Sequence, residues 1–458
     1  MLRDNMHTAK IQKALHIGIK IFFIGMILQF IAHTFITYTV QRENTLWSVI
    51  RAWKEIWILL AGWLILYTWY QLHKENKLQE SIKHFPLKKY TFITILTLIF
   101  IIIIGLATGT PLWATIMSMR YSMTWFVLFI MGTILAGHYE TIWREKRYIK
   151  FIKYLLIGWL IRRWLIYFLP SFIELFWYNK YIFEWQVGQQ PPAVYYSNIN
   201  QGMVRNQFLF ERPIHRWMFL ILFWPLFFTL AIKNKSRQSQ LIRGSIYWLN
   251  ILSTLSRAAR IAWIIQTALL LIILNHKDIK KLILYGFVPM IILLWWFTYW
   301  AQDDIINRNF SNLWHIKHTM TAIQKVGQKP LLGRWPWSAW PASHHRKDVT
   351  NYNPENQYLQ IRIEYGLLWF AWRMYLYLRL QILGYRSYRK LQNHKLSKEQ
   401  RYWSRIIISL SLWLFGLTIE GFFLHSFVDR MIVYPSMLLF GICFAIYYKH
   451  FQHDYKNT

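Results

Sequence analysis

Long apolar runs, separated by shorter polar segments, recur along nearly the whole chain. Most hold roughly 17–25 residues, the length that a helix needs to cross a hydrocarbon core about 30 Å thick. The clearest lie near 14–39, 56–72, 90–109, 115–137, 154–169, 217–232, 280–300, 404–427 and 431–448, and three less regular ones lie near 244–256, 259–275 and 358–384. The pattern predicts an all-α fold, a polytopic bundle of about 12 transmembrane helices that forms a single integral membrane domain over residues 1–458.

Lysine and arginine concentrate in every second polar segment between these runs. The basic segments read KENKLQESIKHFPLKK, REKRYIKFIK, KNKSRQSQLIR, NHKDIKK and YRSYRKLQNHKLSKEQRYWSR. Because short cytoplasmic loops carry the positive excess, we place these segments and both termini on the cytoplasmic side. The long segments 170–216 and 301–357 then lie outside, where a cysteine introduced near Ser343 should react with an impermeant thiol reagent.

The composition narrows the class of protein and of partner. The chain is 55% hydrophobic and carries a net charge of +33, which this orientation and an attraction to anionic membrane lipids explain. Because the charge is spread over many short loops, a nucleic-acid partner is not expected. The single cysteine, Cys443, lies in the last apolar run, so neither an internal disulfide nor a cysteine-based metal site is expected.

The two long outside loops are the expected place for chemistry, because long loops in compact architectures are usually functional. Neither contains a Gly-rich phosphate-binding motif. His344 and His345 are adjacent, so their side chains diverge and do not match the spacing of metal ligands. They are either solvated loop residues or substrate-binding residues, and no metal site is predicted.

Two arginines interrupt the apolar stretch LNILSTLSRAARIAWIIQ. Arg257 and Arg260 are three residues apart and would share one face of a helix. Charges at membrane depth are costly and usually functional, and two guanidinium groups suit phosphate oxygens. Alternatively, the stretch is a short turn whose arginines reach the lipid headgroups. The same two interpretations apply to Arg205 in QGMVRNQFLFERPIHRW.

A third candidate segment, NYNPENQYLQIRIEYGLLWF, spans residues 351–370. Pro354 sets the entry to a helix, and Glu355, Asn356 and Gln360 fall about one turn apart at its start. A carboxylate at this position is a candidate base. The alternative is that these side chains only cap the helix and complement its dipole.

Taken in order, TLSRAARIAWI, KPLLGRWPWSAWPAS, NPENQYLQIRIEYGLLWF and LHSFVDR resemble the O-antigen ligase and polymerase family of integral membrane glycosyltransferases. The resemblance covers about 150–430 and is strongest over 252–262 and 311–370. It implies a GT-C-like helical fold in a bacterial cytoplasmic membrane. It also implies transfer of glycan chains or repeat units from a polyprenyl diphosphate carrier to an acceptor hydroxyl on the outer face, without a metal ion or other cofactor.

The resemblance also assigns residues. Arg257 matches the arginine of the family's motif, and Arg205 matches an arginine before the sixth span. The family has His-Asn where this chain has Glu355 and Asn356, so Glu355 becomes the expected base, with His344 or His345 as substitutes. Arg334, Arg260, Asn356 and Gln360 complete the expected substrate-binding set.

The mechanism implied by this match is inversion at the anomeric carbon. Arg257, with Arg205 and Arg260, would stabilise the charge that grows on the leaving diphosphate. The acceptor is a glycan, a lipid or a protein, and the 301–357 loop is expected to cover the cavity. The alternative function is a polytopic transporter or a flippase for lipid-linked glycans, since twelve spans with buried arginines also describe those proteins.

Tryptophan replaces glycine at several positions of the resemblance. The family favours a Gly-rich run where this chain has Trp335, Trp337 and Trp340, and glycine again near Trp369 and Trp372. Tryptophan outnumbers glycine overall, 27 to 19, although glycine is ordinarily far commoner. Either the source organism reads UGA as glycine and these tryptophans are mistranslations, or the chain has an aromatic belt at its membrane interface.

The first interpretation predicts UGA at most of the codons for residues 314, 335, 337, 340, 369 and 372. Sequencing the gene decides between the two. UGG codons would make the aromatic loop real and would weaken the alignment there, because tryptophan does not readily take the positive φ angles that glycine allows.

Overall fold

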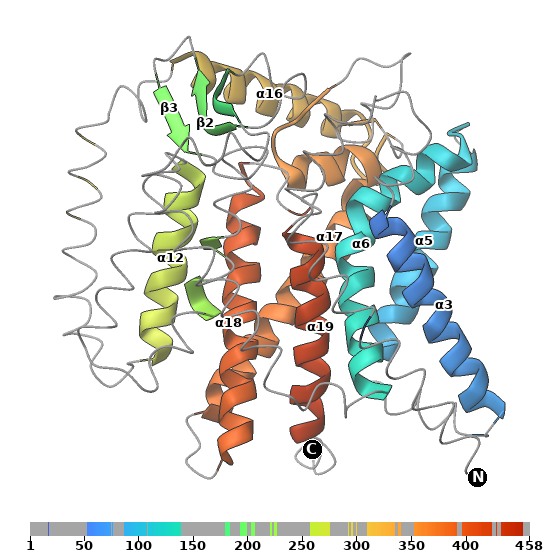
Figure 1. The fold of residues 1–458 in the computed structure, drawn as a ribbon. Helices are drawn as coiled ribbons and strands as arrows, with labels where there is room; N and C mark the ends of the chain where they lie inside the picture. The colour runs from blue at the N-terminus through green and yellow to red at the C-terminus, as the bar shows by residue number, and fades with distance from the viewer. Residues whose placement is uncertain are drawn as a thin grey trace. The chain divides into compact units, whose positions relative to one another are not determined.

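The structure is a computed structural model of the full chain (Figure 1). It describes residues 53–74, 87–107, 109–138, 179–183, 193–198, 203–206, 257–274, 309–334, 352–391, 396–423 and 432–451, with shorter pieces at 17, 76, 220–221, 224–226, 292, 295, 299, 338–339 and 427. The predicted runs at 14–39, 154–169 and 244–256, and most of 217–232 and 280–300, lie outside these residues.

The apolar helices of the described part fall on predicted runs. They are α3 (Trp53–Lys74), α5 (Lys88–Ala107), α6 (Leu112–His138), α12 (Arg257–Leu274), α17 (Gln357–Leu391), α18 (Lys398–Glu420) and α19 (Val433–His450). Three stretches, α5, α18 and Leu112–Ala136 of α6, are long and apolar enough to cross a membrane. These helices confirm that the described part of the chain is mainly helical and that it contains segments able to cross a membrane.

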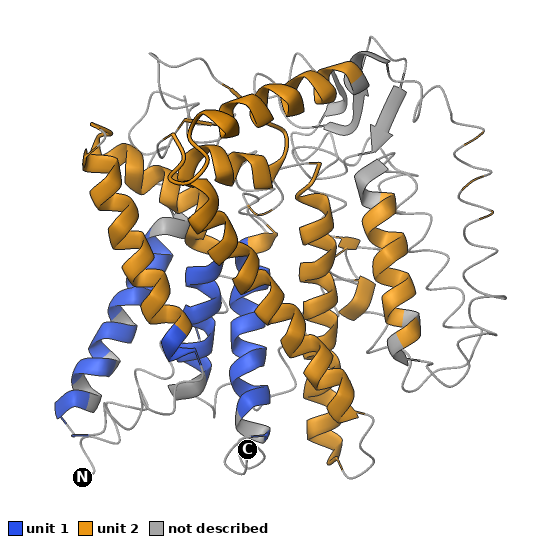
Figure 2. Ribbon diagram, turned by 180° about the vertical axis from the view of Figure 1, so that it is seen from behind, with its two compact units in different colours: residues 1–89, 126–216, 434–458 blue, residues 90–125, 217–433 orange. Residues whose placement is uncertain are grey.

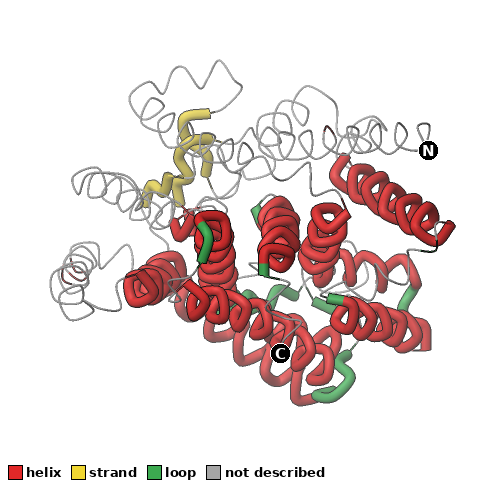
Figure 3. Tube along the Cα trace, turned by 90° about the horizontal axis from the view of Figure 1, so that it is seen from below, coloured by secondary structure: helices red, strands yellow, loops and turns green. Residues whose placement is uncertain are grey.

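Both long loops that are predicted to lie outside contain secondary structure that the sequence analysis did not predict. Within 170–216, strands β1 (Asn179–Phe183), β2 (Ala193–Asn198) and β3 (Met203–Asn206) form a small sheet in that order. β1 pairs with β2 in parallel and β2 with β3 antiparallel. Within 301–357 lies helix α16 (Asn309–Gln328). The prediction of an all-α fold was therefore incomplete in the first loop. Figure 3 shows the three strands, in yellow, as one small group.

The chain divides into two compact units that interleave in sequence (Figure 2). Unit 1 comprises residues 1–89, 126–216 and 434–458, and unit 2 comprises residues 90–125 and 217–433. In unit 1, the second half of α6 packs against α19. The Phe129 and Phe440 rings meet edge to face at 5.3 Å, and Thr133 Oγ1 donates a hydrogen bond to Gly441 O at 3.3 Å.

In unit 2, α18 packs against both α17 and α12, and α16 packs against α17. Trp263 and Leu270 of α12 share a buried cluster with Ile408 and Leu412 of α18. Gln266 Nε2 donates to Leu412 O at 3.0 Å, which satisfies a polar group inside this apolar contact. Figures 1 and 2 show α16 running across the end of the unit at which α17 begins.

Two glycines join the turn after α16 to α17. Gly333 has φ +75° and Gly366 has φ +74°, conformations that glycine adopts without strain. A Cβ atom on Gly366 would lie 2.1 Å from Leu331 O. Here α17 is interrupted, and the turn supplies its hydrogen bonds: Arg334 N donates to Ile363 O at 2.7 Å and Leu367 N to Leu331 O at 3.0 Å. The backbone of the turn thus provides the hydrogen-bond partners that α17 lacks where it is interrupted.

Positive φ angles do not occur at the described tryptophans of the codon prediction. Trp314 lies in α16, and Trp369 and Trp372 lie in α17, whereas the described non-glycine residues with positive φ are Asn76 and Glu355. Tryptophan fits these three helical positions without backbone strain. The codon prediction stays a prediction, and Trp335, Trp337 and Trp340 lie outside the described residues.

We expect Gly366→Ala to lower the free energy of unfolding by at least about 2–4 kcal/mol, because it combines a left-handed backbone with a clash against a carbonyl. The control is Gly327→Ala in α16, where an added Cβ meets nothing within 4 Å. That change should be neutral or stabilising by up to about 1 kcal/mol. Thermal unfolding of both variants in detergent measures the difference, and equal melting would contradict the described junction.

Candidate functional site

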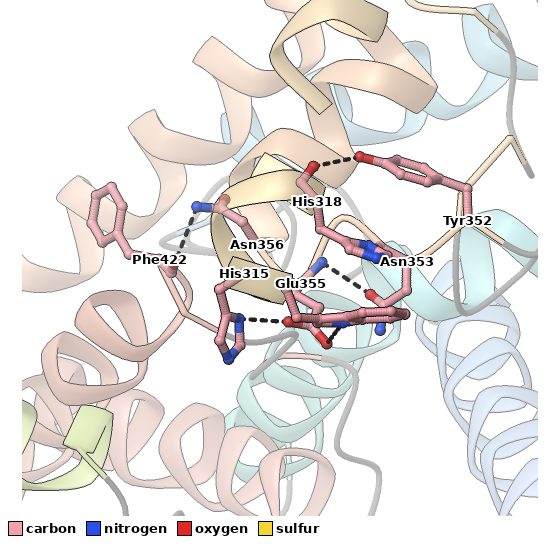
Figure 4. A network of polar contacts seen from close by, with 8 residues as sticks. His315, His318, Tyr352, Asn353, Glu355, Asn356 and Phe422 are labelled. Atoms are coloured by element: carbon pink, nitrogen blue, oxygen red, sulfur yellow. Dashed lines mark hydrogen bonds and ion pairs between the residues drawn. The ribbon is translucent and has the colours of Figure 1, made fainter. Parts of the chain in front are cut away.

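Polar side chains of α16 meet the turn that leads into α17 (Figure 4). The turn is residues 352–356, and the α16 side chains that face it include His315 and His318. We call His315, His318, Tyr352, Asn353 and Glu355 the Glu355 site. The group lies within unit 2 and within residues 301–357, the loop that is predicted to lie outside.

The spacing of residues along α16 explains why the two histidines face the turn. Ala322 and Val326 are buried against Tyr352 and Ile363. Positions three and four residues apart share one face of a helix, so the face that carries Ala322 also carries His318 one turn earlier. A small apolar contact thereby anchors α16 and presents its imidazoles to residues 352–356.

The turn itself is held by side chains acting on the backbone. Asn353 Oδ1 accepts a hydrogen bond from Glu355 N at 3.0 Å, which stabilises a left-handed φ of +50° at Glu355. Asn356 Oδ1 then accepts from Leu359 N at 3.0 Å and caps α17. Asn356 thus caps α17 as the capping interpretation expected, and its role in substrate binding stays a prediction. A left-handed glutamate costs free energy, and such strain is commonly found at functional positions.

The Glu355 carboxylate has a partner on each oxygen. Oε2 lies 2.5 Å from His315 Nδ1, and Oε1 accepts a hydrogen bond from Trp314 Nε1 at 3.2 Å. Burial raises the pKa of Glu355, but the hydrogen bond and charge of His315, with the hydrogen bond from Trp314, outweigh it. The pKa therefore lies below the ordinary 4.5, and the carboxyl group is ionised at neutral pH.

His318 is oriented by a different set of contacts. Its Nδ1 lies 2.7 Å from Asn353 O, and because a carbonyl only accepts, Nδ1 carries the proton. Its ring stacks on Trp314 at 4.2 Å and on Tyr352 at 5.9 Å. The Tyr352 hydroxyl donates to His318 O at 2.7 Å, and burial raises the pKa of Tyr352 to about 12. The tyrosine is thus a neutral hydrogen-bond donor.

The chemical core of the site is the His315–Glu355 pair. The His315 side chain is 42% exposed and that of Glu355 is 21% exposed. When Nδ1 donates to a carboxylate, Nε2 is the nitrogen that accepts a proton, and the carboxylate stabilises the imidazolium that results. The pair can therefore serve as a general base for a hydroxyl that approaches from outside the unit.

Other expected site residues of unit 2 make side-chain hydrogen bonds with residues outside the Glu355 site. Gln360 is buried, and its Nε2 donates a hydrogen bond to Glu364 Oε2 at 3.2 Å. Arg334 lies at the end of the turn after α16 and donates to Gln328 Oε1. Arg260 is buried within α12. Of the expected set, Asn356 lies beside Glu355, while the contacts above place Gln360 and Arg334 elsewhere.

The side chains of four further residues of the expected site lie outside the part of the chain that the structure describes. Arg257 is the first residue of α12, so the helix begins at this arginine. Arg205 lies in β3 opposite Tyr196. His344 and His345 lie outside the described residues altogether. Their predicted roles stay predictions.

The sequence analysis missed His315 and His318. The signal was present as SNLWHIKHTM, in which two histidines three residues apart fall on one face of a helix. It was overlooked because the segment was interpreted as loop. Comparisons with family models, with curated proteins and with solved structures give no match to this chain.

The lowered pKa of Glu355 predicts a pH dependence of stability. A carboxyl group whose pKa is lower in the folded protein stabilises it above the ordinary pKa, and this contribution is lost as the pH falls through the folded pKa. Glu355→Gln should therefore melt below the unmodified protein at pH 7, and the gap should close as the pH drops below 4.5. Thermal unfolding between pH 7 and acid checks this, and a gap that persists in acid would exclude ionised Glu355 as the cause.

Proposed function

We propose that the protein transfers glycan chains or repeat units from a polyprenyl diphosphate carrier to an acceptor hydroxyl on the outer face of a bacterial cytoplasmic membrane. The observation that carries the proposal is the His315–Glu355 pair, a general-base arrangement in the long loop of a helical membrane protein. The order of sequence motifs supports the same reaction. The proposal includes a GT-C-like bundle of about twelve spans with both termini inside.

His315, with Glu355 as its partner, is the proposed base. Glu355 on its own is a weak base, because its pKa is lowered and both of its oxygens accept hydrogen bonds or ion pairs. The acceptor O–H bond breaks, and its proton passes to Nε2 of His315. Glu355 stabilises the imidazolium through Nδ1, as carboxylates do in other hydrolases and transferases that use histidine.

The bonding changes at the sugar are a single displacement. The acceptor oxygen forms a bond to the anomeric carbon while the bond from that carbon to the diphosphate oxygen breaks, and the electron pair of that bond stays on the diphosphate. Attack opposite the leaving group inverts the anomeric carbon. Arg257 and Arg205, with Arg260, would stabilise the diphosphate. His315 then returns its proton to solvent or to the diphosphate.

Replacing His315 by Gln should lower the rate of transfer by about 10²–10⁴-fold, the usual contribution of a general base. The assay uses membranes supplied with carrier-linked glycan, with the protein level measured alongside. Lys317→Gln, an exposed position two residues along α16, is the matched control and should transfer normally. The acid limb of the pH–rate profile should disappear in His315→Gln, which a purely structural role would not cause.

The same assay tests the proposed role of Arg257 in stabilising the leaving diphosphate. Arg257→Lys keeps the charge but loses the forked geometry, so transfer should fall by about 10²–10³-fold, and Arg257→Ala should lose more. Normal transfer by His315→Gln at normal protein level would remove the proposed base. Normal transfer by Arg257→Ala would leave Arg257 as an interfacial residue without a role in the reaction.

A further inference from the structure

The indole ring of Trp314 lies against the Glu355 site and is only partly covered by the protein. Its Nε1 donates a hydrogen bond to Glu355 Oε1 at 3.2 Å, and its ring stacks on that of His318 with the centroids 4.2 Å apart. Although these contacts occupy the N–H group and one face of the ring, the residue is 46% exposed. A large part of an aromatic side chain is therefore accessible beside the site.

The Trp314 ring is held in place by a series of packed side chains. The His318 ring stacks in turn on Tyr352, with the centroids 5.9 Å and the planes 1° apart. Lys325 Nζ lies 3.7 Å from the centre of the Tyr352 ring. Because each member of the series is packed against the next, the indole loses little conformational entropy when a ligand covers it. A large aromatic surface that is already ordered is well suited to binding.

One carboxyl group links this ring to the proposed base. Glu355 Oε1 accepts the hydrogen bond from Trp314, and Oε2 of the same carboxylate lies 2.5 Å from His315 Nδ1. The His315 side chain is itself 42% exposed. A molecule that covers the Trp314 ring therefore lies next to the imidazole that is proposed to take the proton of the acceptor.

Polar groups border the Trp314 ring. Residues three and four positions apart are neighbours on a helix surface, and for Trp314 these include Lys317 and His318. Glu355 borders the ring from the turn before α17. One apolar ring with charged and hydrogen-bonding groups at its edge suits a ligand that has an apolar face and polar edges.

We propose that Trp314 binds the acceptor and that the acceptor is a sugar, whose ring stacks on the indole and presents a hydroxyl group to His315. A pyranose with equatorial hydroxyl groups has polar edges and two faces made of axial C–H bonds. The hydrogens of these bonds are slightly positive, which suits the negative face of an aromatic ring. This inference rests on the proposed function for the reaction, and it selects a glycan over a lipid or a protein as the acceptor.

The proposal requires tryptophan at position 314. Both the hydrogen bond to Glu355 and the stack on His318 need the indole ring. A UGA codon at position 314 that the source organism reads as glycine would therefore overturn the proposal.

The first test measures binding without transfer. The probes are the methyl β-glycosides of glucose and N-acetylglucosamine, whose ring substituents are all equatorial. They are added to the purified full-length protein in nanodiscs, and saturation-transfer-difference NMR records which of their protons contact the protein. Stacking predicts clearly more saturation at the axial protons of one ring face than at those of the other. Equal saturation of both faces, or no binding of either probe, would overturn the proposal.

Two variants separate stacking from the hydrogen bond. Trp314→Phe and Trp314→Leu both lose the N–H donor to Glu355, but only phenylalanine keeps a flat aromatic face. Trp314→Leu should therefore bind the probes about three- to tenfold more weakly than Trp314→Phe, the usual range for an aromatic contact. Equal binding by the two variants would contradict stacking. The control is Met320→Ala, which should bind normally, because Met320 is 59% exposed and lies six positions along α16, on another side of the helix.

Competition separates the classes of acceptor. N-acetyltyrosinamide stands for a protein hydroxyl, and a short-chain diacylglycerol in the nanodisc stands for a lipid hydroxyl. Neither should displace the glycosides. Displacement by either compound at concentrations similar to those of the glycosides would overturn the assignment of a sugar.

The transfer assay keeps this proposal separate from the proposed function. With carrier-linked glycan and a glycan acceptor, Trp314→Leu should show a higher KM for the acceptor than Trp314→Phe, at a similar kcat. Active variants with the same KM would reject the sugar site and leave the proposed function standing. Unmodified protein that bound the glycosides through Trp314 but transferred no carrier-linked glycan would reject the proposed function and leave the sugar site standing.

Discussion

The backbones of Gly333 and Gly366 approach each other closely, and this contact joins the turn after α16 to helix α17. A Cβ atom at Gly333 would lie 2.6 Å from Gly366 N, so no side chain fits between the two segments. In its place the turn and the helix exchange backbone hydrogen bonds. Because buried backbone groups must be paired, this exchange lets α17 break without leaving unsatisfied groups. The same helix α16 that this junction ties to α17 also contacts the turn at 352–356 through His315 and His318.

The Glu355 site shows how a carboxylate can occupy a position where a histidine was expected. Glu355 is held in a left-handed conformation and paired with an imidazole that comes from another helix. The two members of the pair differ in what they contribute: the carboxylate supplies charge and orients the ring, and the partly exposed imidazole presents its second nitrogen. The pair therefore joins two segments of the chain, each of which contributes one of its two members.

Sequence reasoning succeeded where the signal was local. Strongly apolar runs such as 90–109 predicted α5 almost to its ends, because hydropathy alone decides whether such a segment is helical in a membrane. It failed for α16, whose residues are too polar to be noticed as a span and whose helical face is defined only by contact with Tyr352 and Ile363. The run at 358–384 gave no sign of the interruption at Gly366, since one glycine in a helical pattern is usually tolerated.

The candidate site was partly visible in the sequence. Glu355 could be named from its place before an apolar helix, but its partner lies forty positions earlier, and that pairing exists only in three dimensions. Local chemistry also left Asn356 ambiguous between cap and substrate contact, because both uses require the same amide at a helix start. The hydrogen bond to Leu359 N shows that Asn356 caps the helix, and its contact with a substrate stays a prediction.

The way α16 is attached at both of its ends restricts how this helix can move. Its first half is tied to the 352–356 turn through His315 and His318, and the turn that follows it is tied to α17 by backbone hydrogen bonds. A helix fastened at both ends cannot swing open as a hinged lid without breaking those bonds.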